Sequence, residues 1–369
     1  MSQHQPEPPW QESSAAKQAG PPANKPDPAV NHVAQSAFDP LYLQMAELPN
    51  LRLAWQEVRR KGSSGGIDGE TIGSFAGPAE QELVSLHEEL MTGRFVPQPY
   101  KQVSIPKSDG DTRLLGLMSI RDKIVQQSAR TVLEPILDRM FLDVSYGYRK
   151  NKGTARAIKR VAHMIRNEKR LWLTSCDIDA YFDSIDHERL LSQLRGRISA
   201  PDFIRLIQVW LQMGKVSGRL NWRDSVRGIP QGGIISPLLS NFYLNPLDHY
   251  CMDRKYGLVR YADDFVILSA SEETARKALE DVSRFVTSRL KLRLNEGSTV
   301  QHVNQGFEFL GVTFKGGDIT LSEGKLERLK QKLRDAVRRD RMKRAVNVIE
   351  EVDGIRNYYG LLVPQACLE

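Results

Sequence analysis

The stretch Arg260–Leu268, RYADDFVIL, places two adjacent aspartates inside an otherwise apolar run. Tyrosine, phenylalanine, valine and isoleucine favour β-strands, so the run predicts two short strands that meet in a tight turn at Asp263 and Asp264. Adjacent carboxylates repel each other and need either water or positive charge around them. Aspartate is also a common turn residue, so the pair alone is compatible with a plain hairpin turn.

A second acidic strand end lies upstream, where Asp177 follows the predicted strand of residues 171–176. If the two strands pair in one sheet, Asp177 lies beside Asp263. Mg²⁺ prefers carboxylates, water and substrate phosphates as ligands. Two such ions about 4 Å apart can activate an attacking hydroxyl and stabilise the leaving oxygen in phosphoryl transfer. The two acidic strand ends therefore favour a metal site over a plain turn, whereas we interpret three further aspartates as solvated or capping acids: Asp179, Asp183 and Asp186.

Composition sets broad limits on the class of protein. The chain has 369 residues, of which 40% are hydrophobic and 26% charged, enough for two or three domains with a sizeable core. A net charge of +7 suits an acidic partner such as a nucleic acid, and equally an enzyme with an anionic substrate. The three cysteines form no C-x-x-C pair, which argues against a zinc site or a disulfide framework and fits a cytoplasmic location. We find no long apolar run and no signal-peptide pattern, so we expect neither membrane association nor secretion.

The order of predicted elements suggests an α+β protein. Residues 1–36 are rich in Pro, Gln, Ala and Ser and predict a disordered leader. Helices and strands then alternate without a regular βαβ rhythm, which favours a small antiparallel sheet backed by helices. Residues 117–141 have a long helical pattern that we expect to be interrupted near Pro135. Residues 307–321 predict a hairpin, and a basic helical segment follows from Ser322.

Several motifs together resemble reverse transcriptases. YADD between apolar strands is similar to their catalytic hairpin, and residues 177–191, DIDAYFDSIDHERLL, are similar to their first catalytic strand. Residues 227–248, RGIPQGGIISPLLSNFYLNPLD, resemble the loop that contacts template and nucleotide, with its following helix. Three more segments resemble the group II intron lineage, two of them its fingers and the last its N-terminal segment: 105–127, 145–158 and 62–72.

The resemblance implies a right-hand polymerase fold, α+β, with fingers, a small antiparallel palm sheet and a helical thumb. We expect four parts along the chain: a leader at 1–36, an N-terminal extension and fingers at 37–170, a palm at 171–321, and a short basic thumb at 322–369. The implied activity is that of an RNA-directed DNA polymerase, which copies an RNA template into cDNA by two-metal nucleotidyl transfer. The implied cofactors are two Mg²⁺ ions, for which Mn²⁺ can substitute.

The family's catalytic residues carry over to Asp177, Asp263 and Asp264, which the resemblance makes the metal-binding carboxylates. It adds the backbone carbonyl of Ile178 as a further metal ligand. Phe182 takes the place of the aromatic residue that packs beneath the sugar and excludes a 2′-hydroxyl. The alternative for Phe182 is an ordinary core aromatic, and Tyr181 is a candidate for part of the same role.

Nucleotide contacts carry over to two further places. Lys107 and Arg113 flank a turn in the fingertips, where the family holds the incoming triphosphate, although alone they are compatible with two surface charges. Gln231 lies near the nascent pair or the template in this comparison. Gly232 and Gly233 let the backbone approach the nucleic acid. The alternative for this loop is a simple lead into a helix capped by Ser236, which can hold at the same time.

The basic C-terminal segment 325–345 carries ten Lys and Arg residues against three Asp and Glu. We expect a thumb that grips the template–primer backbone, with Arg338, Arg339 and Arg341 as contacts. The alternative is a solvated helix face. One departure from the family concerns catalysis: Ser298 stands where relatives have a lysine that protonates the leaving pyrophosphate, and Lys291 is a candidate substitute.

The expected partners are an RNA template, a DNA or RNA primer and dNTPs. A structured non-coding RNA, an intron RNA or a CRISPR integrase are candidate further partners. We find no His/Cys-rich nuclease segment at the end of the chain, which favours a host-serving role in CRISPR spacer acquisition or antiphage defence over intron mobility. Two alternatives stay open: an RNA-binding splicing cofactor of the intron maturase type, and a protein-primed or template-free polymerase.

Overall fold

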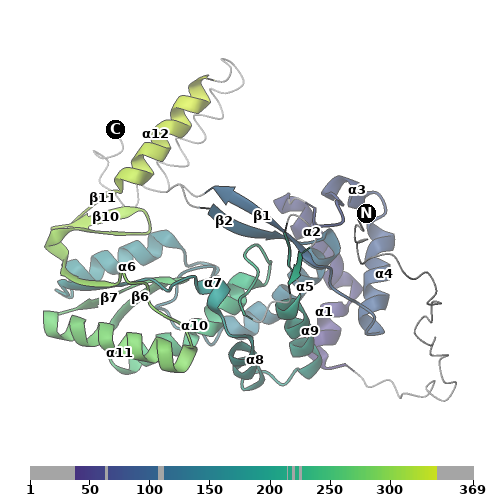
Figure 1. Cartoon of the computed structure of the whole chain (residues 1–369), viewed down its shortest axis with the longest axis horizontal. Coiled ribbons are helices and arrows are strands. Elements are labelled where there is room, and N and C mark those ends of the chain that lie inside the picture. Colours follow the sequence, from purple (N-terminus) through teal and green to yellow (C-terminus); the bar gives the residue numbers. More distant parts are fainter. Residues whose placement is uncertain are drawn as a thin grey trace, which may run out of the picture. The chain divides into compact units, whose positions relative to one another are not determined.

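The computed structural model describes residues 38–62, 65–106, 112–213, 215–217, 221–223 and 227–338. A helical layer forms its N-terminal part, with α1 (Pro40–Ala46), α2 (Leu48–Lys61), α3 (Ile72–Ala76) and α4 (Ala79–Met91) (Figure 1). These helices pack around the long helix α5 (Ile120–Asp138), which α1 and α2 contact directly. The apolar residues that predicted α2 are buried: Leu51, Ala54, Trp55 and Val58.

Helix α5 continues through Pro135, so the expected interruption is wrong. Proline removes one hydrogen bond from the helix, but Pro135 lies only three residues before the last residue, Asp138. Burial of nearly the whole first half of α5 outweighs this local loss. The helix therefore supplies one continuous surface for the N-terminal layer.

A first sheet has the strand order β2-β1-β4-β5. Strands β1 (Tyr100–Pro106) and β2 (Thr112–Leu117) form the antiparallel hairpin predicted for the fingertips, and β4 (Lys215–Ser217) and β5 (Asn221–Arg223) extend it. Gly116 in β2 leaves room for the ring of Tyr100, because a Cβ there would lie 2.7 Å from that ring.

The central sheet is antiparallel and has the order β6-β7-β3-β8. It consists of β3 (Trp172–Cys176), β6 (Gly257–Tyr261), β7 (Asp264–Ser269) and β8 (Thr299–His302). Helix α6 (Thr154–Arg166) covers one face, whereas α10 (Ser236–Asp253) and α11 (Glu272–Leu290) cover the other (Figure 1).

Alternate residues of one strand serve the two faces of this sheet. In β7, Val266 and Leu268 pack in the cluster that contains α6, whereas Phe265 and Ile267 pack in the cluster that contains α10 and α11. Successive side chains of a strand point to opposite faces. Because both faces are buried, the strand is apolar throughout, and its aspartates stand only at its end.

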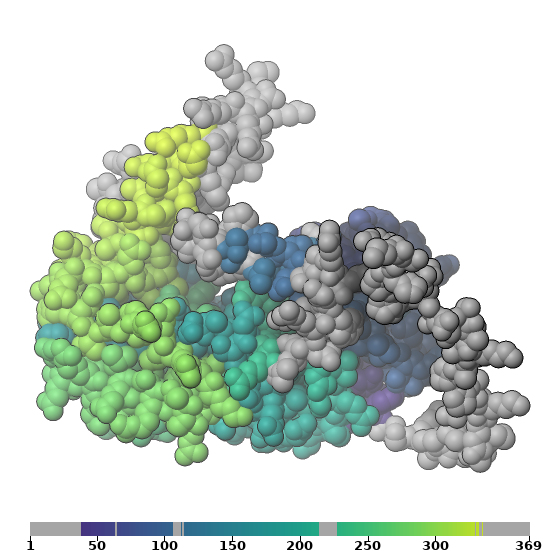
Figure 2. All heavy atoms as spheres, viewed as in Figure 1, coloured from purple at the N-terminus to yellow at the C-terminus, as the bar shows by residue number. Residues whose placement is uncertain are grey.

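Shorter elements connect these layers: α7 (Tyr181–Ser184), α8 (His187–Arg195), α9 (Pro201–Gln212) and η2 (Val303–Gln305). Beyond the central sheet, β9 (Phe307–Phe309), β10 (Val312–Lys315) and β11 (Asp318–Leu321) form a three-stranded sheet, one strand more than the predicted hairpin. Helix α12 (Glu323–Arg338) follows this sheet, and its Leu326 packs against the hydrophobic cluster that the sheet shares with α6. Figure 2 shows α12 in yellow above the green part of the chain. None of the described helices is both long and apolar enough to span a membrane. The predicted leader, 1–36, and the end of the predicted thumb lie outside the described residues.

Candidate active site

Strand pairing brings the three predicted carboxylates to one end of the central sheet. Cys176 in β3 pairs with Phe265 in β7, so the next residues outward, Asp177 and Asp264, leave adjacent strands side by side. Tyr261 pairs with Asp264 across the β6–β7 hairpin, which leaves Ala262 and Asp263 as its two-residue turn. The register thus places Asp264 opposite Asp177, with Asp263 in the neighbouring turn.

The hairpin turn has a backbone conformation that is uncommon for a residue with a side chain. Ala262 has a φ of 59°, in the left-handed region. Gly147 packs against this turn, and a Cβ at Gly147 would lie only 2.6 Å from the Ala262 nitrogen. Gly147 belongs to the segment 145–158 that resembles the fingers, so a residue of this motif also supports the Ala262–Asp263 turn.

The electrostatics of Asp264 and Asp177 are dominated by burial and by repulsion from neighbouring carboxylates. Burial, together with the charges of Asp177 and Asp263, raises the pKa of Asp264 to about 7. Partial burial also raises the pKa of Asp177, although hydrogen bonds from the Ile178 amide and the Asn295 side chain oppose that rise. A divalent cation would remove the repulsion that these shifts express.

The donor set fits a hard cation such as Mg²⁺, because all three side chains offer carboxylate oxygens. Across the described ranges, no group of three or more His, Cys, Asp or Glu residues is already arranged to hold a metal ion. Mg²⁺ usually keeps water and substrate phosphate among its ligands, so a protein site need not be a complete cage. The carboxylates therefore fit a cation whose remaining ligands are water or substrate phosphate.

Ile178 lies in a bridge that leaves its carbonyl available. It pairs with Leu294 in an isolated antiparallel bridge. The two hydrogen bonds of this bridge run from the Asp179 nitrogen to the Arg293 oxygen, 3.0 Å, and from the Asn295 nitrogen to the Asp177 oxygen, 2.8 Å. Because the flanking residues make both bonds, the Ile178 carbonyl points to the other side of the chain. The predicted extra ligand remains a prediction that this geometry allows.

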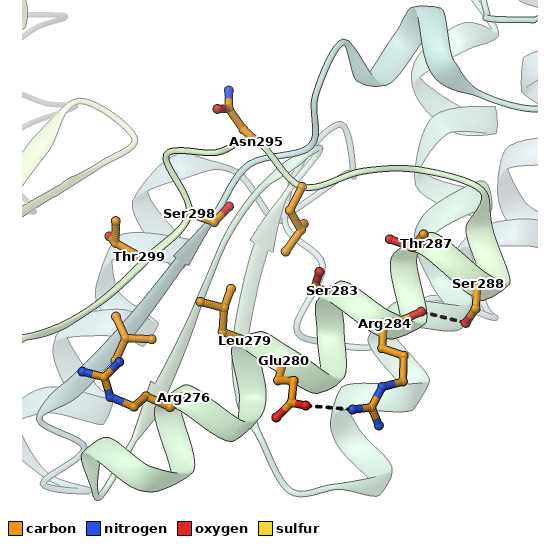
Figure 3. A pocket seen from close by; sticks show the side chains of 12 residues that line it. Arg276, Leu279, Glu280, Ser283, Arg284, Thr287, Ser288, Asn295, Ser298 and Thr299 are labelled. Carbon is orange, nitrogen blue, oxygen red and sulfur yellow. Dashed lines mark hydrogen bonds and ion pairs between the residues drawn. The ribbon is translucent and has the colours of Figure 1, made fainter.

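Asn295 is a site residue that our sequence reasoning missed. Its side chain donates a hydrogen bond to Asp177, which lowers the pKa of that carboxyl. The available signal was the asparagine that begins the segment NEGST, 295–299, three residues before Ser298. Asn295 also lines a groove of about 1020 Å³ between α11 and residues 294–300, and Figure 3 shows its side chain at the rim.

Ser298 and Lys291 have different surroundings in the structure. Ser298 lines the same groove (Figure 3), and its hydroxyl is buried and has no partner among the described residues. Lys291 ends α11, and its Nζ lies 2.9 Å from an oxygen of Asp186. Asp186 also caps α8 by accepting from the Arg189 amide, which confirms its interpretation as a capping acid.

The two neighbouring aromatic residues have different surroundings. Tyr181 is only 2% exposed, and its hydroxyl donates to the Ser240 carbonyl at 2.6 Å, so it is a core residue and its proposed share in sugar selection is wrong. Phe182 is partly buried and meets Tyr181 edge to face, with ring centres 5.5 Å apart. Its carbonyl accepts from the Ile229 amide at 2.7 Å, which ties it to the segment before Gln231.

The Gln231–Gly233 loop docks on the fingers hairpin. The Gly116 amide in β2 donates to the Gln231 carbonyl at 2.6 Å. Gly232 has a φ of 107°, and a Cβ there would lie 2.6 Å from the Gly116 oxygen, so only glycine fits. A Cβ at Gly233 would lie 2.4 Å from the Ser236 hydroxyl, so this glycine is required by the following helix.

The start of α10 differs from the expected cap. The helix begins at Ser236 itself, and the Ser236 hydroxyl donates to the Pro230 carbonyl at 2.8 Å instead of accepting from the helix. Gln126 of α5 supplies the acceptor, because its Oε1 takes the Ile234 amide at 3.0 Å. Gln126 thus holds the segment just before α10, and the helix itself begins without a side-chain cap.

The remaining predicted contacts are described only in part. Lys107 lies outside the described residues, and the backbone of Arg113 pairs with Ile105 in the β1–β2 hairpin. Arg338 is the last residue of α12, whereas Arg339 and Arg341 lie outside the described residues.

Comparison with known proteins agrees with this geometry. Residues 105–314 match the family described as reverse transcriptase (RNA-dependent DNA polymerase). Protein YkfC of Escherichia coli is 34% identical over 284 residues, which cover 67% of this chain and 74% of that protein. The group II intron-encoded protein LtrA of Lactococcus lactis is 26% identical over 344 residues, which cover 74% of this chain and 56% of LtrA.

Two solved structures match part of this chain at low sequence identity. A chain of a partial Cas6-RT-Cas1–Cas2 complex is 24% identical, with a TM-score of 0.42, and the match covers 66% of this chain and 42% of that one. Telomerase from Candida albicans is 13% identical, with a TM-score of 0.47, and the match covers 72% of this chain and 55% of that one.

The chain belongs to the reverse transcriptase family. Its curated relatives include group II intron-encoded proteins, which confirms the predicted group II intron-like lineage. The predicted α+β polymerase fold and the assignment to RNA-directed DNA polymerases are confirmed as well. Members of this family generally use divalent metal ions. The chain spans about three quarters of YkfC but only about half of LtrA.

Proposed function

We propose that this chain extends a DNA or RNA primer along an RNA template with dNTPs. The observation that carries the proposal is the convergence of Asp177, Asp263 and Asp264 at one end of the central sheet, with the pKa of Asp264 raised to about 7. Carboxylates crowded in this way are ready to accept divalent cations. Membership of the reverse transcriptase family supports the same chemistry.

Each protein group has a defined task in this proposal. When bound, two Mg²⁺ ions, or Mn²⁺ in their place, activate the primer hydroxyl and stabilise charge on the phosphate and the leaving oxygen. The three aspartates and the Ile178 carbonyl would hold these cations, while Asn295 and the Ile178 amide orient the Asp177 carboxylate.

Residues around this site would position the substrates. Lys107 and Arg113 hold the triphosphate, and Phe182 forms the wall beneath the sugar. Gln231 lies beside the nascent pair, on a loop that is fixed to β2 through Gly116. In this proposal the charged side chains bind and orient the triphosphate. Ribonucleotides are excluded because their 2′-hydroxyl would clash with Phe182.

The basic C-terminal segment would bind the duplex backbone as a thumb, from residue 322 to residue 369. Seven described side chains of α12 are exposed, and four of them are basic: Lys325, Arg328, Lys330 and Arg334. We propose that Arg338, Arg339 and Arg341 contact phosphates, together with Gly232 and Gly233 at the template. Such contacts predict binding that weakens steeply with salt.

For the cellular role we propose cDNA synthesis in CRISPR spacer acquisition or antiphage defence, in the cytoplasm. A second candidate is an RNA-binding splicing cofactor. It is supported by the similarity to LtrA and to nuclear intron maturase 4 of Arabidopsis thaliana, which is 27% identical over 165 residues. A structured RNA or a CRISPR integrase would be the additional partner in the first role, and an intron RNA in the second.

Primer extension on a defined RNA template tests the polymerase proposal. The protein should add dNTPs in the presence of Mg²⁺ or Mn²⁺, and Asp263→Ala with Asp264→Ala should abolish addition while the protein stays folded. Asp179→Ala is the matched control, because it removes an exposed aspartate two residues from Asp177. Undiminished extension by the double variant would contradict the assignment. Splicing of an intron RNA by that inactive variant would support the second candidate role.

A further inference from the structure

Arg260, the residue that precedes the YADD turn by two positions, is completely buried. Its side chain is 0% exposed and is among the largest fully buried side chains of the described residues. A buried guanidinium is costly unless its charge is paired and its donors are all satisfied. The position lies in β6, where an apolar side chain would pack without that cost. The arginine therefore needs an explanation beyond packing.

All five N–H donors of Arg260 have acceptors. Nε and Nη2 donate to the two oxygens of Asp248 at 2.6 and 2.5 Å, in a two-pronged pair. Nη2 also donates to the Ser145 hydroxyl at 2.9 Å. Nη1 donates to the Asn241 side-chain oxygen at 3.0 Å and to the Ala262 carbonyl at 2.9 Å. The guanidinium is planar, so the four other bonds determine the direction of the one that reaches Ala262.

The backbone around Arg260 is held as firmly as its side chain. The Arg260 amide donates to the Val144 carbonyl at 2.8 Å, and the Tyr146 amide donates to the Arg260 carbonyl at 2.8 Å. Asn241 also donates to the Gly147 carbonyl at 2.6 Å. This is the same Gly147 that packs against the Ala262 nitrogen. The turn is therefore clamped on both sides, by Arg260 at the Ala262 carbonyl and by Gly147 at its amide.

The charge of Arg260 persists in this setting. Burial lowers the pKa of its guanidinium, but the carboxylates of Asp248 and Asp263 raise it, so the net pKa is raised. The guanidinium thus stays cationic beneath the turn and interacts with Asp263. Since Asp248 neutralises it, its main effect on the carboxylates is through geometry.

We propose that Arg260 is a positioning residue for the catalytic turn. Asp248 and Asn241 of α10 hold the Arg260 side chain, which bonds to the Ala262 carbonyl and keeps Ala262 in its left-handed conformation. This conformation sets the direction in which Asp263 faces Asp177 and Asp264. The inference rests on the proposed metal site, and it adds that the two α10 side chains support that site from below the sheet. Loss of the fork should loosen the turn and weaken cation binding more than dNTP binding.

Mn²⁺ binding by the folded protein without nucleic acid tests this role, because free Mn²⁺ can be counted by electron paramagnetic resonance. Arg260→Lys keeps the charge but loses the planar fork, and we expect its Mn²⁺ affinity to fall about tenfold or more. In primer extension, kcat should fall while KM for dNTP changes less than about twofold. Ser128→Ala is the control for stability, since it deletes a buried hydroxyl that donates to the Met45 carbonyl at 2.6 Å in the N-terminal layer. It should lower the thermal midpoint and leave Mn²⁺ affinity unchanged.

The double variant Asp263→Ala with Asp264→Ala distinguishes a failure of the positioning role from a failure of the metal site. Equal Mn²⁺ affinities for wild type and Arg260→Lys, both above that of the double variant, overturn the positioning role alone. A wild-type affinity no higher than that of the double variant overturns the metal site, and the positioning role with it. If Arg260→Lys does not fold, Asn241→Ala decides in the same way, because it removes one of the two acceptors that orient Nη1.

Discussion

Replacing Asp264 by Asn should stabilise the metal-free protein above neutral pH while it destroys the proposed activity. Asp264 begins β7 beside Asp177 and Asp263, and without a cation these three charges oppose one another. Asparagine has nearly the same shape and carries no charge. The variant therefore relieves a repulsion that the wild-type protein tolerates for function.

The size of the effect follows from the pKa of Asp264. Burial, Asp177 and Asp263 raise this pKa from 3.8 to about 7. Between those values the native state holds the proton and the unfolded state has lost it, so the free energy of unfolding falls as pH rises. The slope is about 1.4 kcal/mol per pH unit, which adds up to about 4 kcal/mol as an upper limit once the pH exceeds the native pKa.

Urea unfolding in metal-free buffer, followed by tryptophan fluorescence from about pH 5 to about pH 8, measures this difference. The stability of Asp264→Asn relative to wild type should grow by about 2 kcal/mol between about pH 5 and about pH 7 and level off above the native pKa. Asp253→Asn at the exposed end of α10 is the control, because it removes one carboxyl outside the cluster of three. Added Mg²⁺ should stabilise wild type and narrow the gap. A stability difference that is constant over this pH range would refute the electrostatic argument.

Three further outcomes are expected. Phe182→Ala should let ribonucleotides compete, and about tenfold lower selectivity in kcat/KM would correspond to about 1.4 kcal/mol; an equal loss for both nucleotides would make Phe182 a core residue only. Charge reversal of the three arginines predicted at the thumb should flatten the dependence of duplex affinity on salt, and an unchanged slope would return them to a solvated face. Gly232→Ala should cost about 1–2 kcal/mol in the loop conformation and push the loop off Gly116, which lowers primer extension. Gly73→Ala, where a Cβ would meet only the Thr71 hydroxyl oxygen at 3.7 Å, should match wild type.

Local patterns in the sequence were sufficient to predict the YADD hairpin and its partner strand. An apolar run flanked by aspartate predicts a strand whose end is solvated. If the two predicted strands pair in one sheet, Asp177 lies beside Asp263. The bridge to Leu294, which brings Asn295 to Asp177, joins segments more than a hundred residues apart. Nothing in a local pattern indicates such a contact.

Long-range compensation explains the other differences from expectation. Tyr181 could not be separated from Phe182 by sequence, because the choice depends on the Ser240 carbonyl that only the folded α10 supplies. Gln126 of another helix holds Ile234, just before the start of α10, and the helix begins without the expected serine cap. The buried role of Arg260 was likewise invisible, since an arginine beside two aspartates suggests a surface ion pair rather than a fork directed at a backbone carbonyl.

The location of Mn²⁺ in crystals of a complex with RNA template, DNA primer and incoming dNTP tests the central claim most directly. Anomalous scattering identifies the metal without assumptions about the protein. The account predicts Mn²⁺ bound by Asp177, Asp263 and Asp264 beside the triphosphate, and none there in Asp263→Ala with Asp264→Ala. Mn²⁺ held only by the triphosphate, away from all three carboxylates, would contradict it.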